Sequence, residues 1–213
     1  MTTLLLIRHG ESIANVDGRF AGHLDIPLSE TGYVQADITA QYIHAHYTVD
    51  AVYASDLLRA FHTGKAVADT FGLSITPDAA LREVFAGDWE GAIYDELPKR
   101  FPTSFHTWLT DIGNAACENG ETVAELQKRV LDALRRIAAE HDGKTVVVAT
   151  HATPIRAVQC YCEGKTLSEM KNVPWVSNAS VTVLEYEDNR FRLLEAGKDE
   201  HLGKKRTAFP KKI

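Results

Sequence analysis

Leu4-Leu5-Leu6-Ile7-Arg8-His9-Gly10-Glu11-Ser12 is the stretch that decides the fold of this chain. Four consecutive large apolar residues predict a strand that is buried on both faces, as the strands of parallel sheets are. The strand is expected to end near Ile7, because continuing it would push Arg8 or His9 into apolar packing. Both side chains would then lie at the carboxyl edge of the sheet, where open α/β sheets bind ligands. Gly10 would let the backbone come close to whatever His9 touches.

Two further segments repeat this arrangement. The short strand 50–54 leads to Ser55, a candidate N-cap, and Arg59 follows about one turn into the next helix. The β-branched strand 145–150 delivers His151 to its end. Because the carboxyl ends of parallel strands share one edge, the polar side chains of all three strand ends should meet there: Arg8, His9, Arg59 and His151. Two guanidinium groups and two imidazoles suit a phosphoryl group.

The rest of the chain alternates helices with strands. Helices are expected over 30–46 after an N-cap at Ser29, over 56–71, and over 123–141 after a capping box at Thr122. The first of these helices has an apolar face that should be the buried one: Val34, Ile38, Tyr42 and Ala45. The alternation predicts an α/β fold, a three-layer α/β/α sandwich with a mostly parallel sheet.

Two regions depart from this rhythm. Residues 91–120 are expected to form short helices around 93–100 and 102–111, as a helical insertion or cap over the site. Residues 181–186 and 190–195 predict a hairpin at the sheet edge. We expect the whole chain, 1–213, to form a single domain.

Composition narrows the class of protein. With 213 residues, a formal net charge of −6 and a pI near 5.8, the chain is not expected to bind nucleic acid or an anionic membrane. We expect a cytoplasmic protein, because no segment resembles a signal peptide or a membrane span. The three cysteines are expected to be buried, inert thiols. The basic tail 204–212 is expected to be mobile, and a homo-oligomer remains an open alternative.

The side chains expected at this edge of the sheet are suited to a phosphoryl transfer. A neutral imidazole at His9 can attack phosphorus and later leave it, while Arg8 and Arg59 neutralise the phosphoryl oxygens without a metal or another cofactor. Other routes lack their motifs: there is no Gly-x-x-x-x-Gly-Lys-Ser/Thr loop, no cysteine six positions before an arginine, and no Gly-x-Ser-x-Gly elbow.

Several motifs together resemble the histidine phosphatase superfamily, in its phosphoglycerate-mutase-like branch. They lie in the same order and spacing over nearly the whole chain: Arg8-His9-Gly10-Glu11-Ser12 with Asn15, Ser55-Asp56-Leu57-Leu58-Arg59-Ala60, Leu81-Arg82-Glu83 with Gly87-Asp88-Trp89-Glu90-Gly91, and Thr150-His151. The resemblance agrees with the fold expected above.

Residue roles follow from the resemblance by matching position. It implies that His9 becomes phosphohistidine, and that Glu83 is first the general acid and then the base that activates water. It also implies a phosphate clamp with substrate-binding backbone beside it: Arg8, Arg59 and His151, helped by Asn15, Ala21 and Gly22. The resemblance also makes Ala152 a substrate-binding position, although the family usually has glycine there. Alanine would be strained if the backbone needed a positive φ, and nothing changes if the backbone only offers its N–H.

Three functions remain as alternatives. The leading one is a metal-independent phosphomonoesterase acting on a small-molecule phosphate ester. The second is a phosphoglycerate mutase, which is disfavoured because Val84-Phe85-Ala86 follows Glu83 where mutases have basic and aromatic residues. The third is a non-catalytic phospho-ligand binding protein, against which the intact set of motifs argues. The resemblance reaches to α-ribazole phosphate, phosphoglycerate, sugar phosphates and nucleotides as substrates.

Overall fold

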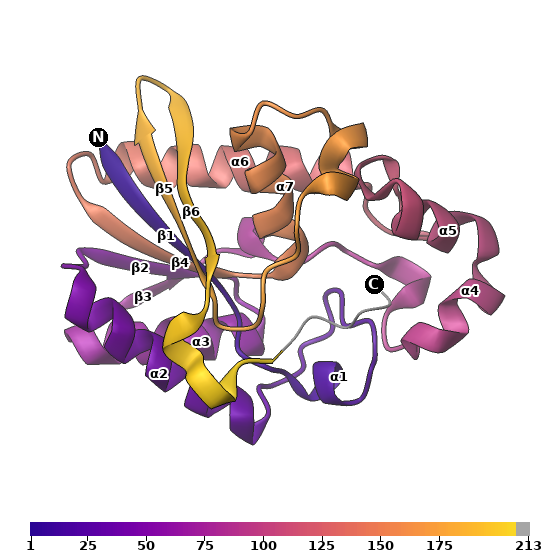
Figure 1. Ribbon diagram of the computed structural model, residues 1–213, viewed down its shortest axis with the longest axis horizontal. Helices are drawn as coiled ribbons and strands as arrows, with labels where there is room; N and C mark the ends of the chain where they lie inside the picture. Colours follow the sequence, from indigo (N-terminus) through magenta and orange to yellow (C-terminus); the bar gives the residue numbers. More distant parts are fainter. Residues whose placement is uncertain (208–213) are drawn as a thin grey trace.

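A six-stranded sheet forms the centre of the computed structural model, which describes residues 1–207 (Figure 1). The strands lie in the order β3-β2-β4-β1-β5-β6. Their bounds are β1 (Thr2–Arg8), β2 (Ala51–Ala54), β3 (Ile75–Pro77), β4 (Thr145–Thr150), β5 (Val181–Glu187) and β6 (Arg190–Lys198). The strands β3, β2, β4 and β1 run parallel, β5 runs antiparallel to β1, and β6 runs antiparallel to β5, so the predicted mostly parallel sheet is confirmed.

The first strand is buried on both faces, as its sequence predicts. Leu4 and Leu6 enter one apolar cluster, and Leu5 and Ile7 enter the other. The strand runs one residue further than expected, because Arg8 still pairs with Thr150 of β4. Arg8 nevertheless ends the strand, so its side chain and that of His9 still leave the sheet at the expected edge.

Helices cover the two faces of the sheet and complete the three layers (Figure 1). The helices α2 (Glu30–His46) and α3 (Leu58–Phe71) pack on the Leu5 side. On the Leu4 side lie α6 (Val123–Glu140) and α7 (Ala152–Cys162). The capping box at Thr122 forms as predicted, and α3 ends at Gly72, which is in the left-handed conformation.

Short helices form in residues 91–120, where the alternation of strands and helices is interrupted. Between β3 and α6 the chain forms α4 (Leu97–Arg100) and α5 (Pro102–Thr110), with 3₁₀ turns at 94–96 and 112–114. Phe105 and Trp108 of α5 are buried in the core cluster beneath this region. Further short elements are α1 (Ile13–Val16) and 3₁₀ turns at 79–81, 87–89, 167–172 and 200–205.

The predicted buried face of α2 is wrong. Val34 and Ala45 are exposed, and the buried positions are Gly32, Gln35, Ala36, Thr39, Ala40 and Ile43. Polar residues are tolerated on this face because they have partners. Gln35 Oε1 accepts the backbone N–H of Glu11, and the Thr39 hydroxyl donates to the Ala179 carbonyl. The face that packs is therefore the one that hydrogen-bonds to loops distant in sequence.

The C-terminal hairpin forms at the sheet edge as expected. Asp188 and Asn189 both have positive φ, which is the requirement of a tight primed turn. The expectation of a mobile basic tail is wrong for its first residues, since Gln35 Nε2 donates to the Lys205 carbonyl. Residues 208–212 of that tail lie outside the described residues.

Gly10 is needed for a close approach, although not to a ligand. A Cβ at Gly10 would lie 2.4 Å from the Gly32 carbonyl oxygen in the first turn of α2. We therefore expect Gly10→Ala to lower the free energy of unfolding by about 1–3 kcal/mol and to lower kcat/KM, because the displaced loop carries His9. Urea unfolding and steady-state kinetics measure both effects.

Gly143→Ala is the matched control for Gly10→Ala. Gly143 has a φ of +75°, and a Cβ added there would meet no atom within 4 Å. Its replacement should cost about 1 kcal/mol of stability through backbone strain alone, with unchanged kcat/KM. If Gly10→Ala also left kcat/KM unchanged, the close packing of this loop would not position His9.

Candidate functional site

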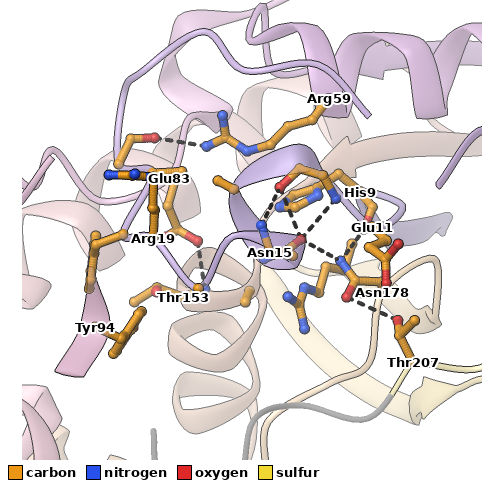
Figure 2. Close-up of a pocket in the computed structure, with 18 of the residues that line it drawn as sticks. His9, Glu11, Asn15, Arg19, Arg59, Glu83, Tyr94, Thr153, Asn178 and Thr207 are labelled. Carbon is orange, nitrogen blue, oxygen red and sulfur yellow. Dashed lines mark hydrogen bonds between the residues drawn. The ribbon is translucent and has the colours of Figure 1, made fainter. Parts of the chain in front are cut away.

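A cavity of about 160 Å³ opens at the carboxyl edge of the parallel strands (Figure 2). The sequence-predicted residues that line it are Arg8, His9, Asn15, Ala21, Gly22, Arg59, Glu83 and Ala152. His151 is not among the lining residues, but its ring packs against that of His9. The four side chains expected at the strand ends, Arg8, His9, Arg59 and His151, are therefore brought together.

His9 has one nitrogen fixed and one nitrogen open. Nδ1 lies 2.7 Å from the Gly10 carbonyl oxygen, which can only accept, so Nδ1 carries the proton. No hydrogen bond to a described residue occupies Nε2. Burial lowers the pKa of His9 well below its usual 6.5, with Arg59 and Arg8 lowering it further. The ring is therefore a neutral imidazole with a lone pair on Nε2 at neutral pH.

Two buried guanidinium groups flank this imidazole. Arg8 is 4% exposed and donates through Nη1 to the Val176 carbonyl at 2.6 Å. Arg59 is 1% exposed and donates to the carbonyls of Gly22 and Leu24, both at 2.8 Å. Burial lowers the pKa of each arginine to about 10, so both stay cationic at neutral pH. Cations held this far from water favour an anionic ligand.

His151 packs against the ring of His9. The two ring centroids are 5.1 Å apart in an edge-on arrangement, and His151 Nε2 lies 2.8 Å from the Ser55 hydroxyl. Burial, followed by Arg59 and His9, lowers the pKa of His151 well below 6.5. Ser55 is thus a partner of His151 and not the predicted N-cap: Leu57 takes that position, which puts Arg59 in the first turn of α3.

Ala152 is unstrained. It is the first residue of α7 and is not among the residues with positive φ. A glycine is therefore not required at this position, and the departure from the family pattern leaves the backbone unchanged.

Glu83 reaches the cavity from the segment between two 3₁₀ turns. Its Oε1 accepts the N–H of Val84 at 2.8 Å, and its Oε2 accepts the N–H of Thr153 at 3.3 Å. The Thr153 contact links the carboxyl group to the first turn of α7, directly after His151 (Figure 2). Glu83 also raises the pKa of Arg8 and of Arg59 electrostatically, which places its charge near both guanidinium groups.

Asn15 presents its amide nitrogen to the cavity. Its Oδ1 accepts from the Ser12 N–H, the Ser12 hydroxyl and Asn178 Nδ2, so the oxygen side is occupied. Nδ2 makes no hydrogen bond within the described residues and can donate to an anion. Ala21 and Gly22 add backbone to the same wall, and Gly22 needs its glycine because a Cβ would lie 2.5 Å from Glu90 Oε1.

Several residues at or beside this cavity have no role predicted from the sequence. Asn178 donates to the His9 carbonyl at 3.0 Å, and the Thr207 hydroxyl donates to Asn178 Oδ1 at 3.1 Å. Asn178 was detectable in principle, because β5 is antiparallel to β1 and the residues before it must lie at the same edge. No pattern in the sequence indicates that Thr207 lies beside the cavity. The other lining residues missed include Glu11, Arg19, Tyr94 and Trp175.

Two residues whose sequence context indicates only a structural role also lie at the site. His23 has no neighbours at ligand spacing in the sequence, yet its Nε2 lies 2.8 Å from the Glu83 carbonyl oxygen. Trp108 packs in the core and also lines the cavity.

Acid should destabilise this site. Both His9 and His151 have folded pKa values lowered below the unfolded value near 6.5, so below that pH the unfolded chain binds protons that the folded chain does not. Each histidine should then make the free energy of unfolding fall by about 1.4 kcal/mol per pH unit below pH ~6. Urea unfolding of wild type and His151→Gln between pH 7 and 5 measures this. The variant should have the shallower slope, and identical slopes would contradict a neutral His151.

The cysteines and the potential metal ligands of residues 1–207 form no second site of this kind. All three cysteines are free; Cys117 and Cys160 are buried as expected, whereas Cys162 is half-buried. Burial raises the pKa of each of the three thiols. Within residues 1–207 no three His, Cys, Asp or Glu side chains are grouped so that they could hold a metal ion. In the same range no helix combines the length and the apolar character needed to cross a membrane.

Comparisons with known proteins agree with the geometry. The chain is 32% identical over 203 residues to phosphoserine phosphatase 1 of Hydrogenobacter thermophilus, with 95% of each chain covered. It is 32% identical over 197 residues to phosphoglycerate mutase-like protein 4 of Arabidopsis thaliana, covering 92% of this chain and 81% of the relative. The structure of YhfR from Bacillus stearothermophilus superposes with a TM-score of 0.90 at 31% identity, covering 95% of this chain and all of that one.

The family comparison covers most of the chain. Residues 4–199 match the model of the histidine phosphatase superfamily (branch 1). The family and the relatives' names support a phosphatase. This chain therefore belongs to the histidine phosphatase superfamily, branch 1.

Proposed function

We propose that this protein is a metal-independent phosphomonoesterase that hydrolyses small phosphate esters through a phosphohistidine at His9. One observation carries the proposal: a neutral, buried imidazole with an open Nε2 lines a cavity between two buried guanidinium groups. A nucleophile of this kind needs no metal, because Arg8 and Arg59 neutralise the phosphoryl oxygens.

The first step transfers the phosphoryl group to the enzyme. The Nε2 lone pair of His9 forms an N–P bond as the bond from phosphorus to the ester oxygen breaks. Glu83 gives its proton to that oxygen, so the alcohol leaves neutral and Glu83 becomes a carboxylate. Arg8, Arg59, His151 and the amide of Asn15 hold the transferring oxygens.

The second step returns the enzyme to its starting state. The Glu83 carboxylate takes a proton from water, the water oxygen bonds to phosphorus, and the N–P bond breaks. Inorganic phosphate leaves, His9 is again neutral, and Glu83 is again protonated. Hydrolysis therefore uses the same carboxyl group in both directions of proton transfer.

The cavity favours hydrolysis over a mutase reaction. A mutase must hold a second phosphate beside the reacting one, which requires cations in addition to the clamp. Among the described lining residues the further cation is Arg19, whose side chain is 44% exposed and donates to the Gly91 carbonyl. One exposed arginine does not make a second phosphate clamp.

A substrate panel tests the proposal. O-phosphoserine heads the panel because the first relative above is named a phosphoserine phosphatase, followed by phosphoglycerates, sugar phosphates, nucleoside monophosphates and p-nitrophenyl phosphate. We expect release of inorganic phosphate from at least one ester in the presence of excess EDTA. Loss of activity in EDTA, restored by a divalent metal, would overturn metal independence. Phosphate transfer between phosphoglycerates that exceeds hydrolysis would favour the mutase.

The proposal also includes the cytoplasm as the location of the enzyme, since small phosphate esters are cytoplasmic metabolites. Fractionation of cells that express the chain at its natural level tests this. Recovery in the membrane or secreted fraction would contradict it.

A further inference from the structure

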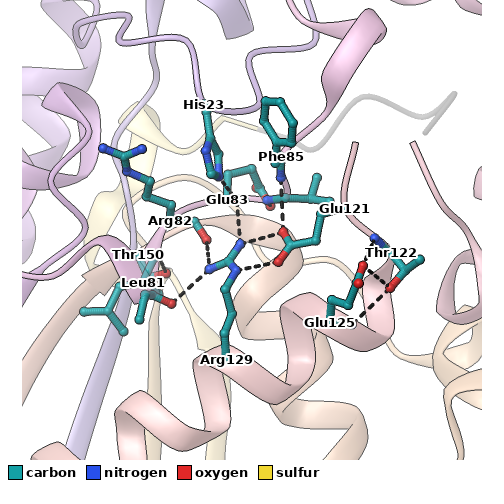
Figure 3. A network of polar contacts seen from close by, with 12 residues as sticks. His23, Leu81, Arg82, Glu83, Phe85, Glu121, Thr122, Glu125, Arg129 and Thr150 are labelled. Carbon is teal, nitrogen blue, oxygen red and sulfur yellow. Dashed lines mark hydrogen bonds and ion pairs between the residues drawn. The ribbon is translucent and has the colours of Figure 1, made fainter. Parts of the chain in front are cut away.

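Side chains, and not a neighbouring strand, hold the backbone that carries Glu83. Residues 80–83 lie outside the sheet, and their four carbonyl oxygens all accept from side chains (Figure 3). The Leu81 carbonyl accepts from the Thr150 hydroxyl at 2.7 Å. The other three, on Ala80, Arg82 and Glu83, accept from Arg129 at 2.9, 2.8 and 2.7 Å. A single residue of α6 therefore fixes most of this segment.

Arg129 uses all five of its N–H donors. Nη1 donates to the Ala80 and Arg82 carbonyls, and Nη2 donates to the Glu83 carbonyl and to Glu121 Oε2. Nε donates to Glu121 Oε1 at 2.6 Å. A lysine has three donors on one nitrogen and cannot reproduce this planar pattern. The geometry of the segment thus depends on the guanidinium group and not only on its charge.

Glu121 and His23 complete the support. Glu121 Oε2 accepts the Phe85 N–H at 3.2 Å, so the ion pair also holds the chain just after Glu83. His23 donates to the same Glu83 carbonyl as Arg129, from the loop that carries Gly22. That loop is tied to the clamp, because Arg59 donates to the Gly22 carbonyl. The segment that carries Glu83 and the clamp residue Arg59 are therefore connected through the loop of Gly22 and His23, with one hydrogen bond on each side.

We propose that Arg129 is a positioning residue for Glu83, which sets the carboxyl group where it can protonate the leaving oxygen. The inference rests on the proposed function, in which Glu83 is the general acid. Arg129 is absent from the cavity lining, so it does not act on the substrate itself. Without it, the half-buried carbonyls of Ala80 and Arg82 lose their donor and the Glu83 carbonyl keeps only His23, so the segment must shift to find others. A displacement of about 1 Å in such a group costs on the order of 10²-fold in rate.

The dependence on leaving group separates positioning from general damage. An alkyl ester such as O-phosphoserine needs a proton on its leaving oxygen, whereas p-nitrophenolate leaves without one. We would measure kcat/KM, which reports phosphoryl transfer to His9, for both esters with wild type, Arg129→Met and Arg129→Lys. Arg129→Met should lower kcat/KM about 10–100-fold for the alkyl ester and less than about threefold for p-nitrophenyl phosphate. Arg129→Lys should show the same selectivity with a smaller loss.

Controls distinguish this inference from the proposed function. Lys128→Met removes the adjacent cation of α6, which within residues 1–207 bonds only to Asp132, and should leave kcat/KM for both esters unchanged. Glu83→Gln should lower kcat/KM for the alkyl ester much more than for p-nitrophenyl phosphate. Suppose that Glu83→Gln shows this selectivity. If both Arg129 variants then lower kcat/KM equally for the two esters, or do not lower it at all, the positioning role is wrong. If Glu83→Gln is not selective, the general-acid role itself is wrong. Thermal unfolding identifies any variant that fails to fold, and Arg129→Lys then decides the question.

Discussion

His9→Ala is expected to lower kcat/KM for every phosphate monoester by at least about 10⁴-fold. The variant keeps both buried arginines but loses the nitrogen that we propose attacks phosphorus, and the methyl group of alanine offers no substitute. Water is a poorer nucleophile than the imidazole nitrogen. The loss should therefore fall on kcat and spare binding.

Phosphate binding distinguishes loss of the nucleophile from loss of the site. Calorimetric titration with inorganic phosphate should give a Kd for His9→Ala within about tenfold of that of wild type, because Arg8 and Arg59 remain. His44→Ala, at an exposed position of α2, is the control and should be fully active. Activity of His9→Ala near the wild-type level would remove His9 from the mechanism. A wild type that binds phosphate but hydrolyses no ester of the panel would favour the non-catalytic binding protein.

Glu83→Gln is expected to lower kcat/KM for O-phosphoserine by about 10²–10⁴-fold, the range that general acids contribute. Glutamine keeps the shape and an oxygen that can accept from the Val84 N–H, but it has no proton to give. The second step should slow as well, since the amide cannot take a proton from water. With p-nitrophenyl phosphate the first step survives, so the phosphoenzyme should accumulate.

A burst experiment measures this second prediction. Glu83→Gln mixed with p-nitrophenyl phosphate should release one p-nitrophenolate per enzyme rapidly and then turn over slowly. Glu11→Gln is the matched control, since Glu11 also lines the cavity and accepts from the Ser29 hydroxyl. It should show no selectivity between the two esters. Equal losses on both esters for Glu83→Gln, without a burst, would mean that Glu83 only supports the structure of the cavity.

The strand ends could be predicted because their signal is local. A run of apolar residues followed by Arg8 and His9, and a β-branched run followed by His151, each place a polar group where packing ends. Parallel pairing of β1 with β4 then brings the two histidines together, to a ring distance of 5.1 Å. Short patterns of this kind predict the strands and, of the cavity wall, Arg8, His9 and Arg59.

Contacts between distant segments could not be predicted in this way. The predicted face of α2 is wrong because Gln35 and Thr39 look like surface residues until their partners in other loops are known. Arg129 looks like an ordinary charged position of an amphipathic helix, and its three carbonyl acceptors lie 46 to 49 residues away. Periodicity reports which residues are apolar, and it carries no information on which carbonyls lack a strand partner.

The most direct test of the proposed mechanism is to trap the phosphoenzyme. Wild type and Glu83→Gln would be mixed with p-nitrophenyl phosphate, quenched in alkaline denaturant, digested and examined by mass spectrometry. We predict one phosphoryl group on the peptide that contains His9, stable in base and lost in acid, and none in His9→Ala. A phosphoryl group on another residue, or none in either protein during steady turnover, would contradict the mechanism.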